Sequence, residues 1–267
     1  MINYKYNELA YAEIISEKGF QTKYIPTELR LLTLYYRDVL KLKPKVREEK
    51  IYEFCNDYIT DFKKEKYFKT INKALNTGLK KETKLIVISE IEIYTNELNY
   101  INSLDIKYEY KKVIFAFLVQ CKLNKIVCEY KYEKDYDSVN IYFKGGNKKY
   151  NDIKKMANIP VKMSINDEVI NELSKLELIT ILHKGTIILE CVKNCIEDGG
   201  VAITITDYEN VGLYLDFYNG VKGVKKCEKC DIPIKVIKNN QKYCKICSEI
   251  VDREKARNRM SNIRMSN

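Results

Sequence analysis

Hydrophobic residues in the first hundred positions recur at the spacing of an α-helix. Leu31, Leu32, Tyr35 and Val39 share one side of a segment that Pro26 precedes and Pro44 follows, which predicts a helix over residues 27–41. The same spacing predicts helices over residues 45–59, 65–79 and 96–104. Short apolar runs at 85–88 and 91–94 are typical of strands. We therefore expect a mainly helical domain over residues 1–105.

The third of these helices illustrates the expected core. Phe68, Ile71 and Leu75 fall on one face of residues 65–79, with Gly78 close to the end. Such a stripe predicts side chains that pack inward rather than a binding site.

Helical and strand patterns alternate in the central region, residues 106–220. Apolar spacing predicts a helix over 107–123, a strand over 139–143 and a short helix over 150–158. Ser164 stands three residues before Asp167, the arrangement of a capping box, and opens a predicted helix over 164–177 with Leu176 on its inner stripe. Two β-rich runs, 180–183 and 186–189, flank Lys184-Gly185 and predict a hairpin.

This order of elements, over about residues 107–192, resembles a winged helix-turn-helix domain. The resemblance implies a recognition helix at 164–177 and a wing at 183–186. Asn166 and Asn171 on the helix can then read adenine edges, and Lys184 on the wing can contact phosphate. Three acidic residues on the same helix face, Asp167, Glu168 and Glu172, repel phosphate, so a winged helix used for dimerisation or partner binding is the alternative.

Four cysteines near the end of the chain carry the clearest chemical signal. Cys227-x-x-Cys230 and Cys244-x-x-Cys247 are separated by thirteen residues, an arrangement typical of a zinc ribbon. With thiolates in all four positions the metal has no site for water. We therefore predict one structural Zn²⁺ in a ribbon over residues 221–250.

Positive charge is concentrated in the same part of the chain. The net charge is +10, and residues 222–267 hold thirteen basic and five acidic residues. A concentrated basic end favours a polyanionic partner such as nucleic acid, although a solvated tail is the simpler alternative. The basic tail, residues 251–267, has only a weak apolar stripe and can form a helix on a polyanion. The residues expected to meet phosphate are Lys225, Lys226, Lys229, Lys242, Lys245, Arg253, Lys255, Arg257 and Arg259.

The sequence Gln-Lys-Tyr-Cys at 241–244, followed by an arginine-rich segment, resembles the C-terminal ribbons of uncharacterised proteins from phages and mobile elements of low-GC Gram-positive bacteria. The resemblance covers the last fifth of the chain. It implies such an origin and association with nucleic acid, but no activity. Abundant Lys, Ile, Asn and Tyr agree with an AT-rich genome.

Several classes of function are excluded by what the sequence lacks. The single histidine, His183, falls at the predicted hairpin tip, and neither a catalytic triad nor a phosphate-binding loop is present. The carboxylate pairs Glu90/Glu92 and Asp135/Asp137 are better interpreted as solvated faces. Five further cysteines lack partners and are expected to be buried thiols: Cys55, Cys121, Cys128, Cys191 and Cys195.

The sequence therefore predicts an α+β protein with a helical N-terminal region, a winged-helix-like centre and a zinc ribbon with a basic tail. No apolar run is long enough to span a membrane and the N-terminus lacks a signal-peptide pattern, so we expect a location in the bacterial cytoplasm. The expected function is non-catalytic nucleic-acid binding, with DNA favoured over RNA, in transcriptional regulation or replication, and a homodimer fits this class. The alternative is an anti-defence inhibitor that binds a host protein or nucleoprotein complex.

Overall fold

The computed structural model describes residues 6–132, 142–144, 147–183 and 186–265. The chain forms two compact units, each of which combines two stretches of sequence. The N-terminal unit comprises residues 2–89 and 124–136, and the C-terminal unit comprises residues 90–123 and 137–267. The first boundary falls at residue 89, whereas the sequence suggests 105, because the segment after 89 pairs with a strand from the C-terminal unit.

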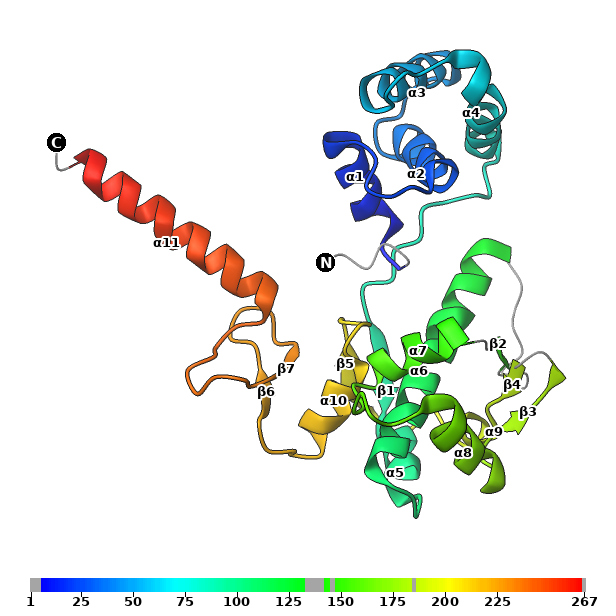
Figure 1. Ribbon diagram of the computed structural model, residues 1–267, viewed down its shortest axis with the longest axis vertical. Coiled ribbons are helices and arrows are strands. Elements are labelled where there is room, and N and C mark those ends of the chain that lie inside the picture. Colours follow the sequence, from blue (N-terminus) through cyan, green and yellow to red (C-terminus); the bar gives the residue numbers. More distant parts are fainter. Residues whose placement is uncertain (1–5, 133–141, 145–146, 184–185, 266–267) are drawn as a thin grey trace. The chain divides into compact units, whose positions relative to one another are not determined.

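Four helices lie wholly within the N-terminal unit: α1 (Glu8–Lys18), α2 (Ile25–Asp38), α3 (Pro44–Tyr58) and α4 (Lys64–Leu79) (Figure 1). Asn7 caps α1 by accepting a hydrogen bond from the backbone N–H of Ala10 at 3.1 Å. Helices α2 and α3 each carry a proline in the first turn, where its missing N–H costs no helical hydrogen bond. The three helices predicted between residues 27 and 79 are thus confirmed, with ends shifted by a few residues.

Side chains from all four helices meet in one hydrophobic core. Its members without solvent exposure are Ala12, Ile15, Leu29, Leu32, Leu34, Ile51, Cys55 and Ile71. Burial raises the pKa of the Cys55 thiol to about 12, so this cysteine is an inert core residue as predicted. The prediction that Phe68 packs inward with Ile71 is wrong, because its side chain is 52% exposed.

Two buried carboxylates join the helices to their loops. Glu28 accepts hydrogen bonds from the Tyr11 hydroxyl at 2.8 Å, the Gln21 backbone N–H at 2.8 Å and the Thr22 hydroxyl at 2.6 Å. Glu8 accepts from Arg30 at 2.7 Å and from the backbone N–H of Ile86 at 3.0 Å. Each buried charge is therefore compensated by several donors.

The strand predicted at residues 85–88 does not form. Among the described residues this segment makes a single antiparallel bridge, Asn7 to Val87, and pairing ends there because α1 begins at Glu8. Backbone hydrogen bonds from Glu8 to Ile86 and from Ile88 to Tyr6, both 2.8 Å, fix the segment along the start of α1.

The C-terminal unit begins with β1 (Ile91–Tyr94), α5 (Thr95–Ser103) and α6 (Tyr108–Tyr132), whose residues from 124 onward belong to the N-terminal unit. It continues with β2 (Tyr142–Lys144), α7 (Asn147–Met156), the π-helical segment η1 (Ile165–Ile170) and α8 (Asn171–Lys175). The remaining elements are β3 (Thr180–Ile181), β4 (Thr186–Ile188), α9 (Glu190–Lys193), β5 (Val201–Ile205), α10 (Val211–Tyr218), β6 (Val224–Lys226), β7 (Pro233–Lys235) and α11 (Lys245–Met265) (Figure 1).

Three small antiparallel sheets connect these elements. Strand β1 pairs with β5, strands β2, β4 and β3 form a sheet in that order, and β6 pairs with β7. The predicted hairpin at 180–189 is confirmed, with Ile181 opposite Ile187. Lys184 and Gly185, its predicted turn, lie outside the described residues.

Helix α6 provides the core of this unit. All residues from Val113 to Val119 are at most 2% exposed, so the helix is covered on every side. The Phe117 ring packs edge-on against Phe143 of β2 at 5.2 Å between centroids. Next to this core, Lys112 of α6 forms a buried ion pair with Asp216 of α10 at 2.7 Å. A side chain in place of Gly212 would put its Cβ 2.0 Å from the Ala157 carbonyl oxygen, so α10 packs this closely only because the residue is glycine.

The segment predicted as one α-helix over 164–177 is divided. Ser164 accepts the backbone N–H of Asp167 at 3.2 Å and so caps it as expected. The first six residues are π-helical, and the Val169 N–H bonds to the Ser164 carbonyl, five residues back, at 3.2 Å. The helix ends two residues early, and Leu176, predicted to be buried, is 45% exposed.

Candidate metal centre

The last hairpin and the start of α11 bring the four predicted ligands together. The first cysteine pair lies in the turn between β6 and β7, and the second lies where α11 begins. Two backbone hydrogen bonds close the turn, from Cys227 to the Ile232 carbonyl at 2.9 Å and from Asp231 to the Cys227 carbonyl at 3.0 Å. Asp231 has φ of 58°, the left-handed conformation that a tight turn needs and that Asp tolerates.

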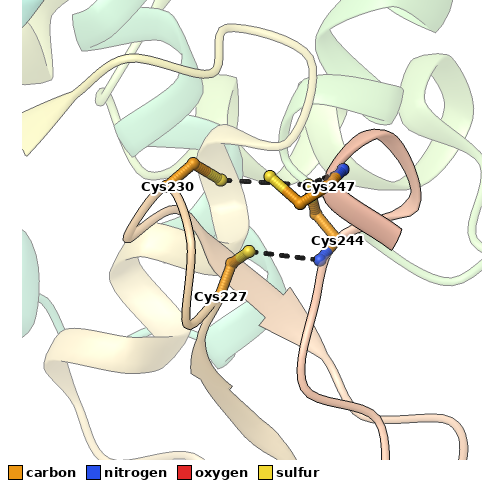
Figure 2. Close-up of side chains that lie close together, drawn as sticks. All are labelled: Cys227, Cys230, Cys244 and Cys247. Atoms are coloured by element: carbon orange, nitrogen blue, oxygen red, sulfur yellow. Dashed lines mark hydrogen bonds between the residues drawn. The ribbon is translucent and has the colours of Figure 1, made fainter. Parts of the chain in front are cut away.

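The sulfur atoms form one compact group, as Figure 2 shows. All four Sγ atoms lie within 4.8 Å of one another, and those of Cys230 and Cys244 are 3.8 Å apart. Cys227, Cys244 and Cys247 are buried, whereas Cys230 is exposed. In the part of the chain that the structure describes, this is the one group of His, Cys, Asp or Glu side chains arranged to hold a metal ion.

Backbone N–H groups donate hydrogen bonds to two sulfurs of this group. Cys227 Sγ accepts the N–H of Cys244 at 3.3 Å, and Cys244 Sγ accepts the N–H of Cys247 at 3.3 Å (Figure 2). Burial raises the pKa of Cys227, but amide hydrogen bonds from Cys244, Lys229 and Cys230 outweigh it and lower the value to about 6. The pKa values of Cys230 and Cys247 are raised, first by desolvation of the sulfur atoms and then by hydrogen bonds with Cys227 and Cys244, while the hydrogen bond with Cys230 lowers the value of Cys247. One thiolate thus forms readily, and full ionisation of the group needs a bound cation.

Four sulfur donors define the chemistry that this group can perform. Thiolates select soft or borderline metals, and a set of four fills tetrahedral coordination. Such a centre has no open position for substrate or water. The group can therefore serve as a structural metal site.

The basic residues predicted around the ribbon are almost all at the surface. Lys225 is half-buried and the other eight are exposed. Two of them form ion pairs, Lys229 with Glu254 at 2.9 Å and Lys242 with Glu228 at 3.5 Å. Lys226 lies over the Phe217 ring at 5.5 Å. Among the described residues no carboxylate pairs with the remaining members: Lys225, Lys226, Lys245, Arg253, Lys255, Arg257 and Arg259.

The residues predicted to read base edges are less available for contact with DNA than the basic residues around the ribbon. Asn166 is half-buried in η1. Asn171 is exposed, but its side-chain amide donates to the Asp167 carbonyl at 3.1 Å. Lys184, the third residue of this predicted surface, lies outside the described residues.

A feature that the sequence did not reveal lies beside these residues. The acidic cleft, a cavity of about 530 Å³, is lined by Asp105, Ile106, Lys107, Tyr110, Asp167, Glu168, Asn171, Glu172, Lys175 and Leu176. Lys107 pairs with Glu168 at 3.6 Å and Lys175 with Glu172 at 3.5 Å, so Asp105 and Asp167 leave the cleft with excess negative charge. Its two walls come from segments sixty residues apart, and no local pattern joins them.

Comparison of the chain with protein-family models, with curated proteins and with solved structures finds no match. Among the described residues, no helix combines the length and apolarity that crossing a bilayer requires.

Proposed function

We propose that the chain is a non-catalytic nucleic-acid-binding protein whose C-terminal ribbon holds one structural Zn²⁺ and presents basic side chains to phosphate. The observation that carries this proposal is the four-sulfur group from which β6, β7 and the exposed basic helix α11 extend. Zinc fits because it is the metal most often held by four cysteines in paired knuckles. An origin in a phage or mobile element of low-GC Gram-positive bacteria rests on the sequence resemblance alone, and a cytoplasmic location remains part of the proposal.

Charge supports phosphate as the ligand of the ribbon and tail. Lys255, Arg257 and Arg259 are exposed and free of ion pairs among the described residues, so contact with phosphate breaks no existing pair. The pairs of Lys229 and Lys242 lie at the surface, where exchange of a carboxylate for a phosphate costs about 1 kcal/mol or less. If six or more phosphates are contacted, the affinity for DNA should fall about a thousandfold when the salt concentration rises from 50 to 200 mM.

A winged-helix-like centre is part of the proposal. Its support is the sheet order β2-β4-β3, the packing of Phe143 of β2 against Phe117 of α6 and Tyr150 of α7, and the capped segment after Ser164. The acidic residues beside Asn171 disfavour base reading by this segment. We therefore assign DNA affinity to the ribbon and tail, and a role in dimerisation to the centre.

The test is fluorescence anisotropy of labelled double-stranded DNA across a salt series. We expect a variant with Lys255, Arg257 and Arg259 replaced by alanine to bind about a hundredfold more weakly at low salt, and the slope of log affinity against log salt to fall by about three. The matched control replaces three exposed lysines of the N-terminal unit, Lys23, Lys69 and Lys73, and should bind almost as the parent does. Equal losses in both variants contradict the proposal, as does an intact chain that binds neither DNA nor RNA.

The acidic cleft favours a second candidate, an anti-defence inhibitor that binds a basic surface of a host protein or nucleoprotein complex. Its negative charge opposes naked DNA but complements a cationic protein. Capture of host proteins by the tagged chain, with and without nuclease, separates the two candidates. A partner that survives nuclease and is lost in a Glu168→Lys, Glu172→Lys variant favours the inhibitor.

A further inference from the structure

A second cavity lies in the N-terminal unit, away from the ribbon in sequence. We call it the lysine cleft, and it has a volume of about 560 Å³. Its apolar wall consists of Leu9, Val39, Leu85, Val87 and Tyr130. Val87 is 46% exposed and Tyr130 is 41% exposed, so an aliphatic surface and an aromatic ring are both accessible to a ligand. Cavities of about 300–1,000 Å³ with apolar walls are the usual size for small organic ligands.

Three lysines surround this apolar wall. Lys41, Lys81 and Lys84 line the cleft, are exposed, and form no ion pair within the described part of the chain. The other charged residues of the lining, Arg37 and Asp38, neutralise each other through contacts of 2.6 and 2.8 Å. Within the described residues, the cleft therefore carries three positive charges without a paired carboxylate beside an apolar wall.

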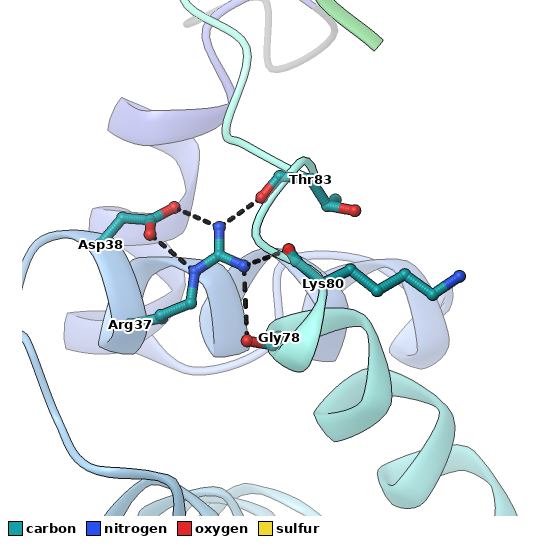
Figure 3. A network of polar contacts seen from close by, with 5 residues as sticks. All are labelled: Arg37, Asp38, Gly78, Lys80 and Thr83. Atoms are coloured by element: carbon teal, nitrogen blue, oxygen red, sulfur yellow. Dashed lines mark hydrogen bonds and ion pairs between the residues drawn. The ribbon is translucent and has the colours of Figure 1, made fainter. Parts of the chain in front are cut away.

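The Arg37 side chain fixes the backbone next to two of these lysines, Lys81 and Lys84, and Figure 3 shows its contacts with that backbone. Its guanidinium donates to the carbonyls of Gly78 at 3.3 Å, Lys80 at 2.7 Å and Thr83. These bonds satisfy carbonyls at the end of α4 and tie residues 78–83 to the end of α2. Lys81 lies within the tied segment and Lys84 directly follows it, so both stand on a fixed backbone.

The third lysine occupies an unfavourable backbone conformation. Lys41 has φ of 54°, in the left-handed region that glycine adopts without strain. The conformation ends α2, where the N–H of Leu42 bonds to the Tyr36 carbonyl at 2.9 Å. Glycine would serve this turn better than lysine, so the fold does not account for the side chain at this position.

We propose that the lysine cleft binds a nucleotide, with the phosphates at the three lysines and the base against the apolar wall and Tyr130. Three ammonium groups around one small cavity match the clustered charge of a polyphosphate or a short phosphodiester chain better than the dispersed carboxylates of an acidic peptide. An aromatic ring next to aliphatic side chains suits the flat face of a base. The nucleotide is either free or a unit of a single strand. This site is independent of the ribbon.

The test uses the full chain and two probes, adenosine triphosphate with a fluorescent label on the ribose and a labelled single-stranded pentathymidylate. Because the chain has no tryptophan, fluorescence of either label is read without protein background in its range. We expect the Lys81→Ala, Lys84→Ala variant to bind at least about tenfold more weakly, since two charge-assisted contacts are lost. Lys41→Gly should weaken binding to a similar degree while its melting temperature stays equal or rises, because the strain is removed.

The control variant Lys69→Ala, Lys73→Ala removes the same charge from the exposed side of α4. The site is supported if only the cleft variants lose affinity for the probes. The probe whose binding depends more strongly on the cleft lysines then identifies the ligand as a free nucleotide or as part of a single strand. A loss in the control equal to that in the cleft variants overturns the proposal, because attraction is then non-specific. Absence of binding by both probes to the intact chain also overturns it. Loss of DNA binding by the tail variant leaves this result unchanged, so the two proposals fail separately.

Discussion

The N-terminal unit and the ribbon differ in the kind of side chain that forms their buried cores. In the N-terminal unit, apolar side chains such as Leu29, Leu32 and Ile51 are fully buried, and burial of each contributes about 1.5–3 kcal/mol. In the ribbon the buried set consists of Cys227, Ile234, Cys244 and Cys247, with Ile232 and Tyr243 packed at its side. Three of these four core members are candidate metal ligands. Cysteine side chains thus form most of the buried core of the ribbon, whereas leucine and isoleucine side chains form much of the core of the N-terminal unit.

The contrast shows why a segment of some thirty residues can be ordered at all. A hydrophobic core of this size is too small to offset the entropy of the chain, and domains below about 40 residues usually need metals or disulfides. No disulfide joins the cysteines of the described chain. A metal ion bound at the four cysteines, as we propose, would supply the stability that the small core of the ribbon lacks, whereas the N-terminal unit has a larger hydrophobic core.

The largest expected effect is from removal of the metal. Cys244→Ser, or a strong chelator, should unfold the ribbon and leave the N-terminal unit intact, because structural zinc sites contribute about 10–16 kcal/mol of binding free energy. Metal analysis should find one zinc per parent chain and none in the variant, and amide hydrogen exchange should report lost protection only in the ribbon and α11. The control is Cys128→Ser, a half-buried cysteine outside the group. Parent protein that is purified without chelator and contains no zinc contradicts the assignment of zinc.

An intermediate effect should appear in the other region. Leu32→Ala leaves a cavity in the N-terminal core and should reduce its free energy of unfolding by about 2–5 kcal/mol, measured by urea denaturation. Metal content should stay at the parent value. If this substitution releases the metal, the two regions do not stabilise themselves separately and the comparison fails.

The smallest effect belongs to the surface of the ribbon. Lys229→Ala breaks the ion pair with Glu254, and both side chains are substantially exposed, at 38% and 56%. We expect the free energy of unfolding of the metal-loaded protein to change by less than about 1 kcal/mol. A double-mutant cycle with Glu254→Ala measures the coupling. A coupling energy well above that limit would show that this surface ion pair, in addition to a bound metal, stabilises the packing of α11 against the turn that carries Cys227 and Cys230.

The sequence correctly predicted those elements whose formation depends on residues that are close together in the chain. Helices α2, α3 and α4 have clear apolar spacing, α2 and α3 also have a proline in the first turn, and the observed ends of all three lie close to the predicted ones. Segment 85–88 was predicted as a strand from its apolar residues, but strand formation also depends on a neighbouring segment, and among the described residues only Asn7 forms a β-bridge with it. Phe68 shows the same limit, since a periodic position becomes buried only where another element covers it.

The candidate sites divide in the same way. The four cysteines are recognisable because both pairs have the spacing of a knuckle, and the structure brings all four together. The lysine cleft joins Leu9, Val39, Lys81 and Tyr130 from four separate parts of the chain. Only the tertiary structure puts such residues side by side, so no sequence pattern could have revealed this cleft or the acidic one.

The position of Cys247 has a consequence for how α11 forms. This residue lies in the first turn of the helix, so coordination of its sulfur also fixes the backbone there. The first turn is the costly step in helix formation, with a nucleation constant of about 10⁻³, and each later residue adds at little cost. If the four cysteines bind a metal ion as proposed, binding of the ion would act as the nucleation event for a helix of 21 residues, roughly 30 Å long. Formation of this helix would then depend on the concentration of free metal ion, because a helix whose first turn is not fixed has to overcome the nucleation cost by itself.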